Sequence, residues 1–89
     1  MKQFLEIGKI VGTHGVRGEM RVEPWADSPD FVCGFDRLYF DKGAKEVEVL
    51  LARVHKRIVL MKLGGVDTME AAAALRGKVL YMNRDDVEL

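Results

Sequence analysis

The residues best placed to do chemistry in this sequence gather in one glycine-rich stretch, from Gly8 to Gly18. Its last seven residues place glycine at every third position. A dinucleotide-binding turn instead needs glycines spaced G-x-G-x-x-G before a helix, and a nucleotide phosphate loop ends in G-K-S or G-K-T. The stretch has neither pattern, and an alternating strand pattern follows it. We therefore interpret its glycines as structural residues of a tight loop between two strands: Gly8, Gly12, Gly15 and Gly18.

The same loop carries side chains that suit a charged partner. His14 and Arg17 fall at the expected tip of the loop, and Arg21 points outward from the strand that follows. Arginine pairs bidentately with phosphate or carboxylate oxygens, and loops on a rigid scaffold concentrate binding residues. Trp25 follows the end of that strand and serves either as an anchor for a partner or as closure of the core. The candidate partner-binding residues are therefore His14, Arg17, Arg21 and Trp25.

Catalytic and metal-binding chemistry finds little support. The one cysteine, Cys33, forms a nucleophile and base pair only if His14 or His55 lies beside it in the fold. Cys33 stands between Val32 and Gly34 in an apolar stretch, which favours a small buried hydrophobic side chain instead. One cysteine and two widely separated histidines do not make a zinc site. We expect no catalytic residue, no metal, no cofactor and no small-molecule substrate.

The charges balance over the whole chain but not along its length. Fourteen Lys and Arg residues face fourteen Asp and Glu residues, which argues against a polybasic, histone-like binder of nucleic acid. Residues 53–62 contain four basic side chains, one histidine and no acid, whereas residues 23–48 contain seven acidic and three basic side chains. These clusters are either solvated strand faces or a dipolar surface, with one side suited to phosphates and the other to a basic protein.

Length and composition favour one small domain. A chain of 89 residues is too short to divide into two cores, and a hydrophobic content of 48% is that of a folded protein. The single cysteine points to a reducing compartment. No apolar run approaches the roughly 20 residues of a membrane helix or the length of a signal peptide. We expect a cytoplasmic monomer that does not contact a membrane.

Alternating hydrophobic residues predict six short strands, over residues 5–11, 19–24, 37–40, 46–55, 58–63 and 78–82. In the first strand, Leu5, Ile7 and Val11 are expected to face inward, and in the second Met20 and Val22. The fourth and fifth strands form a long hairpin that turns at residues 56–57, although no Asn-Gly pair marks the turn.

One segment follows helical rules instead. Asp67 and Glu70 have capping-box spacing, residues 71–75 favour a helix, and Gly77 fits a left-handed stop. Residues 27–30, Asp-Ser-Pro-Asp, predict a turn. Six antiparallel strands with one short helix before the last predict an all-β protein, a six-stranded antiparallel β-barrel or a strongly bent sheet. Closure of the barrel removes edges that so small a sheet otherwise exposes.

Two stretches of this sequence resemble a known family. Residues 7–24, IGKIVGTHGVRGEMRVEP, are similar to the opening of the RimM family of bacterial ribosome maturation factors. Residues 65–77, GVDTMEAAAALRG, resemble the family's later GV-D-x-x-x-A-x-x-L-x-G element, in the right order and at a fitting separation. The resemblance covers essentially the whole chain as the family's amino-terminal domain, and it implies a six-stranded barrel like those of translation factors. The family's loop and basic strand map onto Gly12, His14, Gly15, Gly18, Arg17 and Arg21.

The resemblance also implies a function and a domain division. It implies a non-enzymatic, chaperone-like factor for ribosome biogenesis that binds the small (30S) ribosomal subunit and assists 16S rRNA processing and assembly of the head. The implied partners are the 30S subunit, small-subunit ribosomal protein nineteen and 16S rRNA. Residues 1–83 correspond to the amino-terminal barrel, and residues 84–89 to the start of a linker to a PRC-type barrel that this chain does not include. The alternative is a generic β-barrel adaptor for a protein partner without a ribosomal role.

Overall fold

Strands make up most of the structure, a computed structural model that describes residues 3–25 and 29–87. The strands are β1 Phe4–His14, β2 Glu19–Pro24, β3 Arg37–Phe40, β4 Lys45–His55, β5 Ile58–Leu63 and β6 Val79–Asn83. Helices α1 and α2 span Pro29–Val32 and Met69–Ala73, and the 3-10 helices η1 and η2 span Asp41–Gly43 and Arg84–Asp86. The six predicted strands and the short helix before the last one are confirmed.

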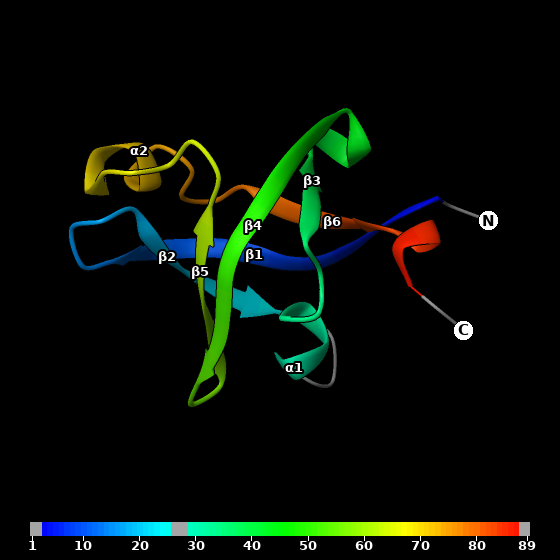
Figure 1. The fold of residues 1–89 in the computed structure, drawn as a ribbon, viewed down its shortest axis with the longest axis horizontal. Coiled ribbons are helices and arrows are strands. Elements are labelled where there is room, and N and C mark those ends of the chain that lie inside the picture. The colour runs from blue at the N-terminus through cyan, green and yellow to red at the C-terminus, as the bar shows by residue number, and fades with distance from the viewer. Residues whose placement is uncertain (1–2, 26–28, 88–89) are drawn as a thin grey trace.

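The strands close into an antiparallel barrel in the order β1-β2-β5-β4-β3-β6. The predicted hairpin joins β4 to β5, with His55 opposite Ile58 at its end. The pairing of β3 with β6 is the shortest in the barrel and consists of one residue pair, Tyr39 and Tyr81. Figure 1 shows the β1–β2 loop and α2 at one end of the molecule and η2 at the other. The barrel therefore presents the glycine-rich loop at one end of a nearly continuous sheet.

Alternate side chains of the strands fill the barrel. Met20 and Val22 of β2 face inward, as predicted, and both are fully buried. The other large side chains with the least exposure are Ile10, Leu38, Met61, Leu63 and Leu80. From β4, Val47 and Val49 pack against the same core. Each strand thus contributes to one core, which holds the surface loops in fixed positions.

The predicted inward face of β1, with Leu5, Ile7 and Val11, is wrong in part. Ile7 is buried, but Leu5 is 41% exposed, and the core instead receives Ile10. Two shifts of register interrupt the pairing of β1 with its neighbours. Such β-bulges add a residue to one strand and so break the two-residue alternation on which the prediction depended.

Helix α2 begins one residue later than the capping box predicts. Thr68 is its N-cap, and the Thr68 Oγ1 accepts a hydrogen bond from the backbone N–H of Ala71 at 3.1 Å. Asp67 instead forms an ion pair with Lys62, at 2.9 Å. Gly77, with φ of +90°, has the left-handed conformation expected of a helix stop.

Helix α1 has no counterpart among the predicted elements. Pro29 and Asp30 were expected to close a turn, but they begin this helix; Asp27 and Ser28 lie outside the described residues. Proline at the first helical position lacks only an N–H that would have no partner there. A helix of four residues is too short to show a helical repeat of apolar residues. No helix of the described residues is long and apolar enough to cross a membrane.

Candidate binding surface

The β1–β2 loop is held against the segment that precedes α2. Gly18 has φ of +90°, and its backbone lies so close to the carbonyl oxygen of Val66 that a Cβ atom would overlap it. The same carbonyl accepts a hydrogen bond from Nζ of Lys62, which also donates to Oδ1 of Asp67 at 2.9 Å. The loop, β5 and the start of α2 therefore form one fixed corner, and Arg17 projects from it.

The other glycines of the stretch have different roles. Gly15 has φ of +72°, and a Cβ atom there would meet nothing within 4 Å. A Cβ atom on Gly8 would lie 2.9 Å from the carbonyl oxygen of Glu23 across the β1–β2 pair. A Cβ atom on Gly12 would lie 2.5 Å from Nη2 of Arg21. The Arg21 guanidinium therefore packs across the bare Cα atom of Gly12, which fixes where its charge is presented.

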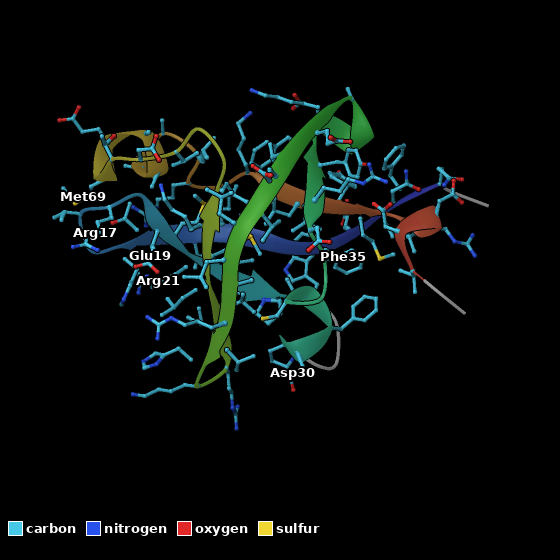
Figure 2. The ribbon with its side chains drawn as sticks, viewed as in Figure 1. Arg17, Glu19, Arg21, Asp30, Phe35 and Met69 are labelled. Carbon is cyan, nitrogen blue, oxygen red and sulfur yellow. The ribbon has the colours of Figure 1, made fainter. Side chains whose placement is uncertain are left out.

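Three of the four predicted binding residues lie on this hairpin. Arg17 and Arg21 are exposed, whereas His14 is half-buried at the end of β1, opposite Glu19. Figure 2 shows Arg17, Glu19 and Arg21 projecting from the β1–β2 hairpin on the left side of the molecule. Within residues 3–25 and 29–87, neither arginine has an acidic partner within ion-pair distance. Both guanidinium groups are therefore available to an external phosphate or carboxylate.

Trp25 lies apart from the arginines, beyond the other end of β2. Its backbone N–H donates to the carbonyl oxygen of Ile7 at 2.9 Å, and its side chain is 45% exposed. With Leu5, Phe31 and Met82, it lines an apolar groove of about 400 Å³. The structure therefore places Trp25 in a second surface feature and does not combine it with His14, Arg17 and Arg21.

The strand order brings a distant basic residue beside the hairpin. Leu60 of β5 lies opposite Arg21 of β2 on one side and opposite Arg53 of β4 on the other. The sequence placed Arg53 in a separate cluster, because no local pattern tells which strand is the neighbour of β2. Lys62, from the same cluster, is engaged with Asp67. Only the pairing of β2 with β5 shows that the hairpin arginines and the basic residues of 53–62 lie on neighbouring strands.

Acidic side chains gather toward the start of β4. A hollow of about 440 Å³ is lined by Gly34, Phe35, Asp36, Arg37, Glu46, Glu48 and Asp86. Arg37 donates to both carboxylate oxygens of Asp86, with Nη2 and Oδ1 2.7 Å apart, and these bonds raise the pKa of Arg37. Because β4 carries Glu46 and Glu48 near its start and Arg53 near its end, charge is separated along one strand.

The environment of Cys33 makes it a poor nucleophile. Cys33 follows α1 and is half-buried against the core. Burial raises the pKa of its thiol, and the neighbouring Asp30 carboxylate raises it further. A thiol with a raised pKa stays protonated at neutral pH, whereas the thiolate is the nucleophilic form. Among the described residues, no three His, Cys, Asp or Glu side chains gather as a metal site requires.

Comparison with known proteins assigns the chain to a family. A family model described as the RimM N-terminal domain matches residues 5–87. The ribosome maturation factor RimM of Parvibaculum lavamentivorans is 39% identical over 79 residues, which cover 89% of this chain and 42% of that protein. The RimM of Clostridium acetobutylicum is 36% identical over 90 residues, which cover 100% of this chain and 53% of that protein. The chain therefore spans about half the length of the curated relatives it matches.

Two solved structures share the barrel. A crystal structure from Pseudomonas aeruginosa, described as that of a 16S ribosomal RNA processing protein RimM, matches with a TM-score of 0.81 and 30% identity over 94% of this chain and 52% of that chain. The N-terminal domain of RimM from Thermus thermophilus, solved in solution, matches with a TM-score of 0.81 over 98% of this chain and 96% of that chain. At 21% identity, this second likeness concerns the fold alone. From the match over residues 5–87 and from these relatives, the chain belongs to the RimM family and corresponds to its amino-terminal domain.

Proposed function

We propose that this chain acts in ribosome maturation by binding the immature small (30S) ribosomal subunit, without catalysing a reaction. The observation that carries the proposal is the pair of exposed arginines, Arg17 and Arg21, on a hairpin that Gly18 fixes against the segment before α2. Guanidinium groups held in this way bind phosphate or carboxylate oxygens at little entropic cost. Relatives named ribosome maturation factors support the ribosome as the particle that is bound.

The zero net charge of the chain agrees with transient binding. Each phosphate contact adds affinity that falls steeply with salt, so a strongly basic factor would bind RNA indiscriminately. A neutral domain with a small basic face releases more readily. In this proposal, the factor assists 16S rRNA processing and assembly of the head by holding the subunit in one conformation. The raised pKa of the Cys33 thiol argues against nucleophilic catalysis at the one cysteine.

The proposed partners are 16S rRNA and small-subunit ribosomal protein nineteen, both within the 30S subunit in the cytoplasm. The separation of charge along β4 supports two partners of opposite sign. The basic end, near Arg53, suits rRNA phosphates, and the acidic end, near Glu46 and Glu48, suits a basic ribosomal protein. We further propose that the barrel domain comprises residues 1–83, where its last strand β6 ends, and that residues 84–89 begin a linker whose first part still packs on the barrel through Asp86 and Val87.

Sedimentation of the tagged 89-residue chain with precursor small subunits tests the proposal. The wild-type chain should migrate with the particles on a sucrose gradient, and Arg17→Ala combined with Arg21→Ala should remain at the top. The melting temperature should stay nearly unchanged, because both side chains are exposed. The matched control is Lys42→Ala with Lys45→Ala, which removes two exposed charges outside the β1–β2 hairpin, in η1 and at the start of β4. A wild-type chain absent from the particles would overturn the proposal.

A second candidate is an adaptor that docks on a protein through the apolar groove. It is favoured by the exposure of Trp25, Phe31 and Leu5, which is large for side chains of their size. On this view, Trp25→Ala should abolish attachment to the partner while the two arginine substitutions leave it intact. Because this adaptor has no ribosomal role, the chain would be absent from the particles in the gradient, and a pull-down with the tagged chain would recover its partner without ribosomal components.

A further inference from the structure

We propose that the outer face of β2, β5 and β4 binds the phosphate backbone of single-stranded RNA along one basic strip. The strip consists of Arg17, Arg21, Arg53, Lys56 and Arg57. It extends the proposed ribosomal site from the glycine-rich loop to the tip of the β4–β5 hairpin. The identification of the RNA as ribosomal rests on the function proposed above, whereas the ability to bind RNA does not.

The register of β2, β5 and β4 places two arginines of the strip, Arg21 and Arg53, in one row across the sheet. Residues directly opposite in an antiparallel pair point to the same face, and Leu60 lies opposite both Arg21 and Arg53. Val59 and Met61, on either side of Leu60 in β5, belong to the core, so Leu60 and the two arginines share the outer face. Neighbouring strands are about 4.8 Å apart, which puts the Cα atoms of Arg21 and Arg53 roughly 10 Å apart. Both guanidinium groups can therefore reach phosphates of the same strand.

The floor between the two arginines is apolar and closed. Leu60, which lies between them on the outer face, is only 2% exposed. On the far side of Arg21, its guanidinium packs over Gly12. This contact restricts the Arg21 side chain and reduces the rotamer entropy that RNA binding would otherwise cost.

The cations of the strip are not neutralised by ion pairs within the described part of the chain. The ion pairs there involve three other basic residues, Arg37, Lys62 and Lys78. Two acids, Glu19 and Glu23, flank Arg21 on the outward face of β2, but neither is within ion-pair distance of a strip residue. The five cations of the strip therefore exceed the acids beside them and give the face a positive potential.

The hairpin tip adds a residue whose backbone disfavours its side chain. Lys56 has φ of +60°, a left-handed conformation that is less favourable for lysine than for glycine. Asn is enriched several-fold in this conformation and would serve the turn better. Figure 1 shows the β4–β5 hairpin projecting at the bottom of the view, and Lys56 and Arg57 in its turn are both exposed. These two exposed cations extend the positive charge of the strip beyond Arg53 to the tip of the hairpin.

The salt dependence of RNA binding measures the strip directly. Each phosphate contact to single-stranded nucleic acid contributes about −0.7 to the slope of log K against log salt. Five contacts give a slope of about −3.5, and removing two should lower its magnitude by about 1.4 and weaken binding about 25-fold at 0.1 M salt. The probe is a fluorescein-labelled, 20-nucleotide single-stranded RNA of mixed sequence, and binding is followed by fluorescence anisotropy. The variants are Arg53→Ala with Arg57→Ala, the single change Lys56→Asn, and the control Lys42→Ala with Lys45→Ala.

The expected result is a reduced slope for the Arg53 and Arg57 pair, about half that reduction for Lys56→Asn, and no change for the control. Lys56→Asn should also raise the melting temperature, which excludes loss of fold as the cause. An unchanged salt slope for the Arg53 and Arg57 pair would overturn the proposal that the strip binds RNA. Competition by poly-glutamate as effective as that by RNA of equal charge would also overturn it, because the ligand of the strip would then be an acidic protein. Particle sedimentation separates this proposal from the previous one. A chain that binds RNA through the strip but not precursor subunits would overturn the ribosomal function alone.

Discussion

Substitution of Gly18 by alanine should destabilise the domain far more than the same substitution at Gly15, although both glycines are left-handed. The left-handed conformation costs any residue with a Cβ atom about 1–2 kcal/mol, and this cost applies to both positions. At Gly15 the added methyl group meets nothing within 4 Å, so no further cost is expected. At Gly18 it overlaps the carbonyl oxygen of Val66, which must move.

That movement carries two further costs. Overpacking of a methyl group against fixed neighbours typically destabilises by about 1–3 kcal/mol. The Val66 carbonyl also accepts a hydrogen bond from Lys62, which would be weakened, and hydrogen bonds to charged groups contribute about 1.5–3 kcal/mol. Since these terms overlap, we expect a total loss of about 3–5 kcal/mol for Gly18→Ala, against about 1–2 kcal/mol for Gly15→Ala.

Urea unfolding followed by far-ultraviolet circular dichroism measures both variants. For a domain of this size, each kcal/mol corresponds to about 4–8 °C, so thermal melts should separate the two variants by at least about 4 °C. The slope of free energy against urea should stay constant, which shows that the same surface unfolds. Equal losses for Gly15→Ala and Gly18→Ala would refute the close approach of the loop to Val66.

Three smaller perturbations test other contacts. Thr68→Ala should lower the free energy of unfolding by about 1 kcal/mol, because the N-cap of α2 is lost. Asp67→Ala should lower it by less, because the ion pair of Asp67 is exposed. A larger loss for Asp67→Ala than for Thr68→Ala in urea unfolding would make Asp67 the cap. Gly12→Ala should change the melting temperature by only a few degrees relative to the wild type, but it should displace the Arg21 guanidinium and weaken RNA binding. An unchanged affinity for RNA, measured by fluorescence anisotropy, would contradict the packing of Arg21 over Gly12. Iodoacetamide should alkylate Cys33 more slowly at pH 8 than it alkylates the thiol of a free peptide, because the raised pKa of Cys33 lowers the fraction of reactive thiolate. The rate for Cys33 should rise at higher pH. A rate equal to that of the peptide would mean that the pKa of Cys33 is not raised.

Local patterns predicted the six strands and α2, but they did not predict α1 or the irregularities within the strands. The strand Glu19–Pro24 alternates regularly, and its inward residues, Met20 and Val22, are the predicted ones. In β1, bulges shift the register, so Leu5 is exposed where alternation buries it. A bulge depends on pairing with neighbouring strands, and a single strand's pattern contains no record of it. Thr68 and Asp67 are both good caps, so only the path of the chain decides between them.

The candidate site shows the same division between local and long-range information. Arg17 and Arg21 were predicted on the loop and its following strand because a turn and an alternating pattern lie in adjacent residues. The neighbourhood of Arg21 and Arg53 depends on β2 pairing with β5 across more than thirty residues, which no local signal encodes. Trp25 was grouped with the arginines because they are close in sequence. The two ends of a strand lie far apart in space, however, and Trp25 lies in an apolar groove beyond the far end of β2.

Site-specific photo-crosslinking in growing cells tests the central claim most directly. A benzophenone side chain introduced in place of Arg53, on the basic end of β4, would be compared with one in place of Lys45, at the strand's other end. Binding of the small subunit through the basic strip predicts 16S rRNA adducts from position 53 and few or none from position 45. Equal rRNA adducts from both positions, or adducts from position 53 only to non-ribosomal molecules, would contradict it.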